Sequence, residues 1–136
     1  MSDVNYIKGQ LDSWKQCINW LEEKYPEKKF ELDHKLHNIK GISYEEKQVG
    51  LFSNESIRRS IIIDQLNELE FEREYCESVV AFCERIVKKV KPQYQNIFIY
   101  RYRTNSTISW ICYKTDYSKS RVYEIIEQET KRLSNE

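Results

Sequence analysis

The sequence predicts an all-α protein, and three observations support this prediction. Glycine and proline are scarce, with three and two residues respectively in a chain of 136. Glu, Lys, Leu and Ile occur in runs that favour helix nearly everywhere. No stretch alternates for long at the period of two that marks a strand. We expect an N-terminal helical hairpin or coiled coil, a long connecting helix and a C-terminal helix-turn-helix domain.

The first element is a helix that packs along another helix. Its apolar residues recur at spacings of three and four, which is the seam of a coiled coil. These residues are Val4, Ile7, Leu11, Trp14, Ile18, Leu21 and Tyr25. Ser2 or Asp3 can cap the start of the helix, and Pro26 is expected to end it.

Residues 26–55 break this pattern, and we interpret them as an irregular, partly ordered connector. Gly41 and Gly50 punctuate the segment, in which Lys and Glu are frequent. Its apolar anchors are scattered along the chain. They are Tyr44, Val49, Leu51 and Phe52.

A long helix is expected from about Ser56 to Val90, with Pro92 ending it. A second three-four seam runs along it through Ile62, Leu66, Leu69, Cys76, Val80, Cys83, Val87 and Val90. The apolar face widens near residue 80, which predicts more than one neighbour there. The narrower N-terminal half predicts a coiled-coil partner, either residues 2–25 or a second chain. Both an intramolecular hairpin and a homodimer satisfy this pattern, so we assign residues 1–91 to a coiled-coil or oligomerisation region.

Residues 92–136 are expected to form the helix-turn-helix domain. Pro92 suits the first turn of a helix from Gln93 to Arg103, because the N–H group that it lacks would have no partner there. Tyr94, Ile97, Phe98 and Tyr102 give this helix an apolar face.

Two further helices follow, joined by a tight turn. Ile108 and Ile111 lie one turn apart on the first, and Cys112 is a small residue where the two helices cross. Asp116 occupies the turn, and Ser118 is suited to cap the second helix.

The second helix of this motif has a buried face and a free face. Val122 and Ile125 face back into the domain. Near the start of the helix, the residues with nothing to pack against are Lys119, Ser120, Tyr123 and Glu124. Helix-turn-helix proteins insert such an exposed N-terminal half into the major groove of DNA. The leading hypothesis is therefore a protein that binds double-stranded DNA.

The distribution of charge supports this hypothesis, although the net charge is zero. Residues 1–84 have a balance of −6, and residues 122–136 have a balance of −2. Residues 85–121 contain nine basic residues and one acidic residue, a balance of +8. A basic block that coincides with a helix-turn-helix suits contact with phosphates. The alternative is a solvated basic face without a partner.

The sequence gives no support to several other classes of protein. No run approaches the roughly 18–20 apolar residues of a membrane span, and the N-terminus lacks the apolar core of a signal peptide, so we expect a cytoplasmic protein. The potential metal ligands are too scattered for a zinc site: Cys17, Cys76, Cys83, Cys112, His34 and His37. No catalytic triad, Gly-rich phosphate loop or carboxylate pair stands out. We expect no enzyme, no metal and no cofactor.

Residues 117–126, Tyr-Ser-Lys-Ser-Arg-Val-Tyr-Glu-Ile-Ile, follow Ile-Ser-Trp-Ile-Cys at 108–112 and resemble the DNA-binding fourth region of bacterial sigma factors. Over residues 56–133, including Arg101-Tyr102, the chain resembles the phage-encoded ArpU/RinA-type transcriptional regulators. The resemblance implies a phage or prophage protein that activates late genes in a bacterial host cell. Thr115 stands where Leu is usual, and Asp116 replaces the turn Gly.

The resemblance also implies roles for individual residues. Lys119, Ser120, Tyr123 and Glu124 occupy positions that reach base edges or nearby phosphates, and their chemistry permits such contacts. Arg121 is expected to bind phosphate or an acidic neighbour. Glu124 can alternatively serve in a salt bridge on the helix, and Tyr123 in the core. The expected DNA-binding residues are Arg103, Lys114, Ser118, Lys119, Ser120, Arg121, Tyr123 and Glu124.

Three functions compete. The first is a sequence-specific transcriptional regulator, an activator of phage late genes. The second is the DNA-recognition small subunit of a phage terminase, which also joins a helix-turn-helix to helical oligomerisation segments. The third is a protein-interaction module that binds host RNA polymerase, with which the acidic N-terminal half is compatible.

Overall fold

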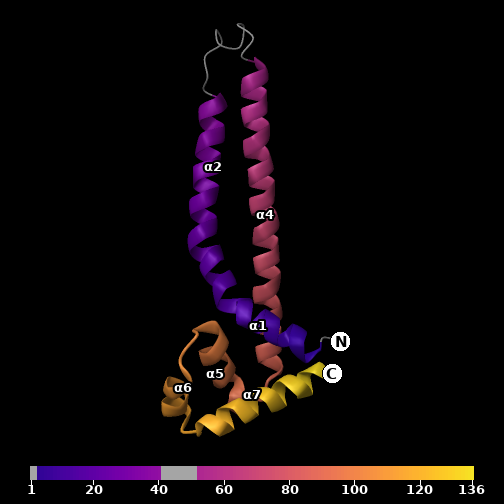
Figure 1. Cartoon of the computed structure of the whole chain (residues 1–136), viewed down its shortest axis with the longest axis vertical. Helices are drawn as coiled ribbons and strands as arrows, with labels where there is room; N and C mark the ends of the chain where they lie inside the picture. The colour runs from indigo at the N-terminus through magenta and orange to yellow at the C-terminus, as the bar shows by residue number, and fades with distance from the viewer. Residues whose placement is uncertain (1–2, 41–51) are drawn as a thin grey trace. The chain divides into compact units, whose positions relative to one another are not determined.

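The computed structural model describes residues 3–40 and 52–136, and these form an all-α chain, as the sequence predicts (Figure 1). No strand occurs in the described residues. The α-helices are α1 (Val4–Asn19), α2 (Tyr25–Lys40), α4 (Phe52–Lys89), α5 (Gln95–Phe98), α6 (Ile108–Thr115) and α7 (Lys119–Ser134). Shorter helical turns lie between some of them: the π-helices η1 (Trp20–Lys24) and η4 (Ile99–Arg103) and the 3-10 helix η3 (Pro92–Tyr94).

The chain folds into two compact units, and α4 contributes to both. The hairpin unit consists of Asn19–Cys76, and the composite unit consists of Met1–Ile18 with Glu77–Glu136. This division differs from the expected domains at 1–91 and 92–136. The reason is that α1 and the end of α4 complete the core of the C-terminal helices. A fragment that began at Pro92 would lack the core residues that α1 and α4 supply, such as Leu11 and Val79.

The hairpin unit contains the first correction to the sequence analysis. The irregular connector expected at 26–55 is wrong over 26–40 and from Phe52 onward, because these residues are helical. Pro26 does not end the helix, because the helical backbone runs without a break from Val4 to Lys40 and a π-helical turn just before the proline already interrupts the regular ladder of hydrogen bonds. In the π-helical turn before it, the Tyr25 N–H donates to the Trp20 carbonyl. The expected anchors Tyr44, Val49 and Leu51 lie outside the described residues.

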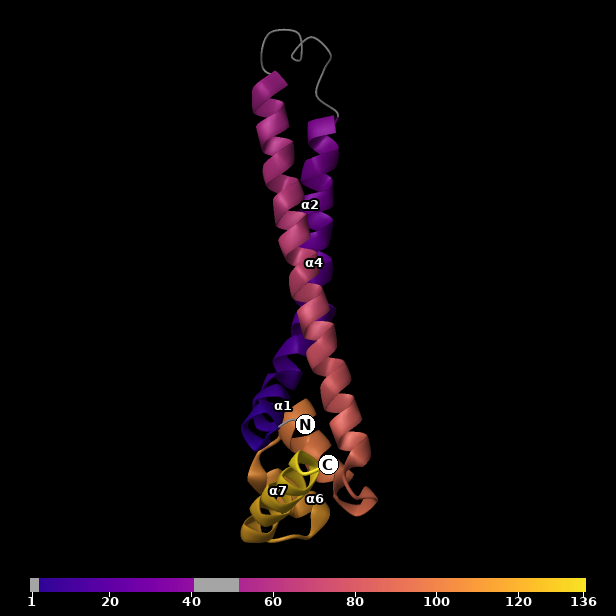
Figure 2. The same cartoon turned by 90° about the vertical axis from the view of Figure 1, so that its right-hand side faces the viewer.

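Within the hairpin unit, α2 and α4 lie side by side and antiparallel (Figures 1 and 2). A three-four seam joins them, made of Leu32, Leu36 and Ile39 on α2 and of Ile62, Leu66 and Leu69 on α4. At one end of the seam, the Tyr25 hydroxyl and the Arg73 guanidinium both donate to the Glu70 carboxylate. These hydrogen bonds lower the pKa of Glu70. Within the chain, the partner of this part of α4 is therefore α2 and not residues 2–25, the first of the two partners that we expected.

The composite unit has one core to which five helices contribute. Its most deeply buried side chains include Ile7 and Leu11 of α1, Val79 and Cys83 of α4, Ile97 and Phe98 of α5, Ile111 of α6, and Val122 and Ile125 of α7. The Cys83 thiol donates to the Gln10 carbonyl at 3.2 Å, which ties α4 to α1. Asp3 caps α1 by accepting the Tyr6 N–H at 2.7 Å, as the sequence predicts.

A buried carboxylate joins α7 to the end of α4. Glu129 is only 3% exposed and accepts hydrogen bonds from the Lys91 N–H and the Arg132 guanidinium, both at 2.8 Å. Arg132 also donates to the Lys89 carbonyl at 2.7 Å, in the last turn of α4. Burial alone would raise the pKa of Glu129, but the hydrogen bonds from Arg132 and Lys91 lower it below its ordinary value. This cluster holds the C-terminal half of α7 against α4.

Candidate nucleic-acid interface

α6 and α7 form the expected pair of short helices joined by a tight turn. Asp116 adopts the left-handed conformation, with φ 62° and ψ 13°, and its N–H donates to the Cys112 carbonyl at 2.9 Å. Aspartate tolerates this conformation, so the turn closes without glycine. Thr115, at the end of α6, donates its hydroxyl to the Ile111 carbonyl at 2.7 Å. The predicted turn at Asp116 is confirmed.

Both helices begin with a side-chain cap. The Ser118 hydroxyl accepts the Arg121 N–H at 3.1 Å, which confirms the predicted cap of α7. The Thr107 hydroxyl accepts the Trp110 N–H at 3.2 Å and caps α6. We did not predict the Thr107 cap, although a threonine just before an apolar-periodic segment is a signal for one.

Ser118→Ala should lower the free energy of unfolding by about 1 kcal/mol, because the first turn of α7 loses its cap. Urea unfolding followed by circular dichroism measures this loss. Ser120→Ala is the matched control. Ser120 is exposed inside the same first turn, so its replacement should change the free energy of unfolding by less than about 0.5 kcal/mol. Equal losses in the two variants would contradict the capping role.

The start of α7 divides into a buried and an exposed face as the sequence predicts. Val122 and Ile125 are fully buried. The four residues expected on the free face, Lys119, Ser120, Tyr123 and Glu124, are all exposed. Tyr123 is 43% exposed, so it does not belong to the core. The Lys119 ammonium and the Tyr123 hydroxyl form no hydrogen bond or ion pair with any residue of the described ranges, 3–40 and 52–136.

Arg121 and Glu124 are engaged with each other. The Arg121 guanidinium donates to the Glu124 carboxylate at 2.8 Å and to the Tyr94 hydroxyl at 3.1 Å. It also lies over the Tyr94 ring, 5.9 Å from the centroid. Gln128 donates to Glu124 at 3.2 Å. This arrangement matches the salt-bridge alternative for Glu124 and the acidic-neighbour alternative for Arg121.

Tyr94 is a residue whose role the sequence analysis missed. It was placed only on the apolar face of its helix, whereas its hydroxyl accepts a hydrogen bond from α7. The separation of 27 residues between Tyr94 and Arg121 leaves no local signal for this contact.

α6 has a second exposed face beside the turn. The Lys114 ammonium lies 5.6 Å from the centroid of the Trp110 ring, which packs edge-to-face on Tyr100 at 4.8 Å. Tyr113 is 79% exposed. We did not single out Tyr113 from the sequence. Its spacing of three from Trp110 is the signal that places both residues on one face.

The basic block of residues 85–121 is divided in space. Lys114 and Lys119 belong to the helix-turn-helix, and Arg103 is exposed at the end of η4. Three other basic residues, Lys88, Lys89 and Lys91, lie at or just beyond the end of α4. Hydrogen bonds place this end of α4 beside Glu129, about 15 Å along α7 from Lys119. Lys119 is the first residue of α7, and Lys114 lies in the last turn of α6.

Comparison with known protein families, with curated proteins and with solved structures finds no match to this chain.

Other kinds of site are not seen in the part of the chain that the structure describes. No group of three or more His, Cys, Asp or Glu residues is placed to hold a metal ion there. No described helix is long and apolar enough to cross a membrane. The thiols of Cys17, Cys76 and Cys83 are buried, and burial together with the neighbouring Cys17 raises the pKa of Cys83 to about 12. Such a thiol is inert at neutral pH.

Proposed function

We propose that this protein is a sequence-specific DNA-binding transcriptional regulator that inserts the start of α7 into the major groove. The observation that carries the proposal is the face formed by Lys119, Ser120 and Tyr123. These three residues are exposed at the start of a helix that is capped at Ser118 and backed by the composite core. Protein groups on such a face are free to form hydrogen bonds with base edges.

The roles follow from the chemistry of each side chain. Lys119 can donate to the O6 and N7 acceptors of guanine, and Ser120 and Tyr123 can bond to bases or phosphates. Arg121 and Glu124 are positioning residues, because their ion pair and the Tyr94 contact hold α7 in place. On α6, the helix that crosses the DNA backbone in this motif, Lys114 is suited to bind phosphate.

The biological setting of the proposal rests on the resemblance to ArpU/RinA-type regulators. It supports a phage or prophage protein that activates late genes, acting in the cytoplasm of the bacterial host. Sequencing the DNA fragments that co-purify with the protein from host cells would identify its target site.

A pair of lysine variants tests the proposal on that target site. Lys119→Ala should weaken the free energy of binding to the selected site by about 1–3 kcal/mol, because a base contact is lost. It should also relax the preference for one base at one position of the site. Lys114→Ala should weaken binding to selected and scrambled DNA alike and lower the salt slope by about one unit, because a phosphate contact is lost. Both variants remove one exposed positive charge from the helix-turn-helix, so each controls for the other.

Binding titrations on the two DNAs separate these effects. If Lys119→Ala weakens binding to both DNAs equally, then Lys119 is a phosphate contact and α7 loses its assignment as the recognition helix. If neither variant changes binding, the helix-turn-helix is not the DNA-binding surface.

The exposed aromatic face of α6 favours a second candidate function, the binding of host RNA polymerase. Exposed apolar patches mark protein interaction sites, and Tyr113 and Trp110 are 79% and 40% exposed. A pull-down of polymerase in the absence of DNA tests this function. Tyr113→Ser should abolish the capture while leaving DNA binding unchanged. Capture that survives Tyr113→Ser would exclude this face.

A further inference from the structure

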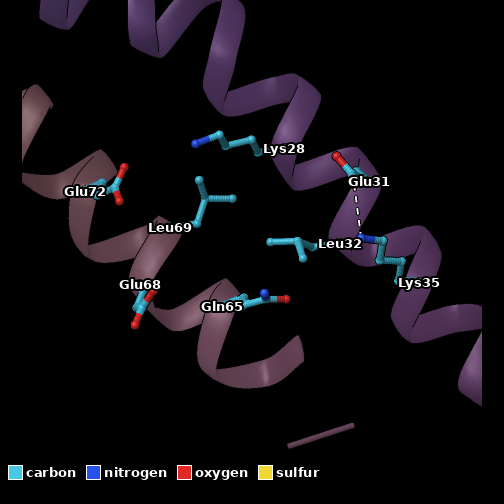
Figure 3. Close-up of a pocket in the computed structure, with 8 residues that line it drawn as sticks. All are labelled: Lys28, Glu31, Leu32, Lys35, Gln65, Glu68, Leu69 and Glu72. Carbon is cyan, nitrogen blue, oxygen red and sulfur yellow. Dashed lines mark ion pairs between the residues drawn. The ribbon is translucent and has the colours of Figure 1, made fainter. Parts of the chain in front are cut away.

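A groove runs along one side of the hairpin unit, between α2 and α4 (Figure 3). It consists of two adjoining hollows of about 280 and 330 Å³, which share Lys35 and Gln65 in their walls. Leu32 and Ile39 of α2 and Ile61, Ile62 and Leu69 of α4 line the hollows with apolar surface. Ile61 is 52% exposed, so part of this apolar surface faces solvent.

The two rims of the groove carry opposite charges. On α2, the rim contains Lys28 and Lys35, with Glu31 between them paired to Lys35 at 3.1 Å. On α4, the rim of the same hollow contains Glu68 and Glu72 (Figure 3). Neither of these two glutamates has an ion-pair partner among the described residues. The α2 rim is thus net positive and the α4 rim net negative.

We propose that a second copy of the chain occupies this groove. A face with one basic and one acidic rim is complementary to itself, as a two-fold symmetric interface requires. A two-fold axis parallel to the hairpin places α2 of each copy against α4 of the other. Lys28 and Lys35 then meet Glu72 and Glu68 of the second copy, because these residues line one hollow and lie at one level.

The other two-fold arrangement is disfavoured by the same charges. An axis across the hairpin would place α2 against α2 and α4 against α4. Lys28 and Lys35 would then face α2 of the second copy, so neither would meet Glu68 or Glu72. With the axis near Gln65, at the middle of the groove, Arg58 can pair with Glu72 of the second copy, which gives fewer ion pairs across the interface than the parallel axis does.

The proposed assembly is a four-helix bundle made from two hairpins. Because α2 and α4 are antiparallel, every helix has antiparallel neighbours, as in up-down bundles. α2 has 16 residues, and the shared face is therefore about 24 Å long and about 20 Å wide. The total buried area would be about 1,000 Å², at the lower limit for a specific interface. We therefore expect a dimer that dissociates at micromolar concentration.

Sedimentation velocity of the full-length chain without DNA provides the test, over about 1 to 100 µM. The proposal goes beyond the proposed function, and its outcome does not depend on DNA binding. Two variants reverse one rim each: Lys28→Glu/Lys35→Glu and Glu68→Lys/Glu72→Lys. Each variant alone should be monomeric, because like charges then face each other across the interface. An equimolar mixture of the two should dimerise like the wild type.

The mixture separates contacts between copies from contacts within one hairpin. Each variant keeps like-charged rims inside its own hairpin after mixing, so only contacts between copies can restore the dimer. Asp33→Lys/Glu74→Lys is the matched control. It makes the same charge change as Glu68→Lys/Glu72→Lys, at exposed positions outside the groove. It removes the surface ion pair between Asp33 and Lys29 but no residue that lines the groove, so it should dimerise like the wild type.

Three results would overturn the proposal: a monomeric wild type throughout this range, a rim variant that dimerises like the wild type, or folded rim variants that stay monomeric when mixed. Circular dichroism verifies that each variant keeps its helix content. If a rim variant loses helix content, the single variant Ile61→Ser takes the place of that variant in the test, because Ile61 is already half exposed and tolerates a polar side chain. Ile61→Ser should weaken the dimer about tenfold, and unchanged association would contradict the proposal.

Discussion

Raising the salt concentration from about 50 to about 200 mM should weaken binding to double-stranded DNA by about a thousandfold. The reason is that about half a dozen phosphate contacts would each release counterions on binding. Residues 85–121 supply the charge for these contacts, with nine basic residues against one acidic residue. Fluorescence anisotropy titrations of labelled DNA with the full-length chain measure the dependence.

The double variant Arg103→Ala/Lys114→Ala tests where these contacts lie. Both residues are exposed, and their loss should lower the slope of log affinity against log salt by about two units. The salt slope of this variant is compared with that of Lys88→Ala/Lys89→Ala, which removes two positive charges at the end of α4, beside the far half of α7. A flat salt response of the wild type would show that the basic residues serve something other than DNA.

Glu129→Ala should lower the free energy of unfolding by about 2–3 kcal/mol, the largest loss of stability that we expect from a single polar residue. The substitution leaves the Lys91 N–H without its acceptor and the Arg132 guanidinium without its nearly buried carboxylate. Glu127→Ala is the matched control two residues earlier on α7. Glu127 is half exposed and pairs with Lys8, so its removal should lower the free energy of unfolding much less than Glu129→Ala does.

The effect of Glu129 should also depend on pH. Its pKa is lowered in the folded chain, so the ionised carboxylate stabilises the fold above its unfolded pKa of about 4.3. This stabilisation is lost as the pH falls through the lowered folded pKa. The difference between wild type and Glu129→Ala should therefore be constant above about pH 5 and shrink below about pH 4. A difference that grows on acidification would contradict the lowered pKa.

Local features of the fold were predictable from the sequence because they depend on neighbouring residues. The seam through Ile7 and Leu11 identified α1 and its buried face. Ser118 and Asp116 marked the cap and the turn of the helix-turn-helix, since capping and left-handed conformations depend on the residue type at one position. The free face at Lys119 followed from helical periodicity alone.

One local prediction failed for a local reason. Pro26 was taken as the end of the first helix, and the seam residues Leu32 and Ile39 beyond it were overlooked. A proline in the interior of a helix removes one hydrogen bond of the regular ladder. Here the π-helical turn at Trp20–Lys24 already interrupts that ladder just before Pro26, and the helix continues through it. The apolar residues at 32, 36 and 39 recur at the helical period, and this signal for a continuing helix outweighs the proline.

The sequence by itself determined the all-α class, the long helix α4 and the face that α7 leaves free, because helical period and capping are encoded within a few residues. Only the tertiary structure decided which seams meet and which polar groups pair. Cys83 bonds to a carbonyl 73 residues away, and Glu129 to an N–H group 38 residues away. Such pairs arise when distant segments share one core, and no local pattern records which segments those are. For the same reason, the groove between α2 and α4 became visible only once the two helices stood together.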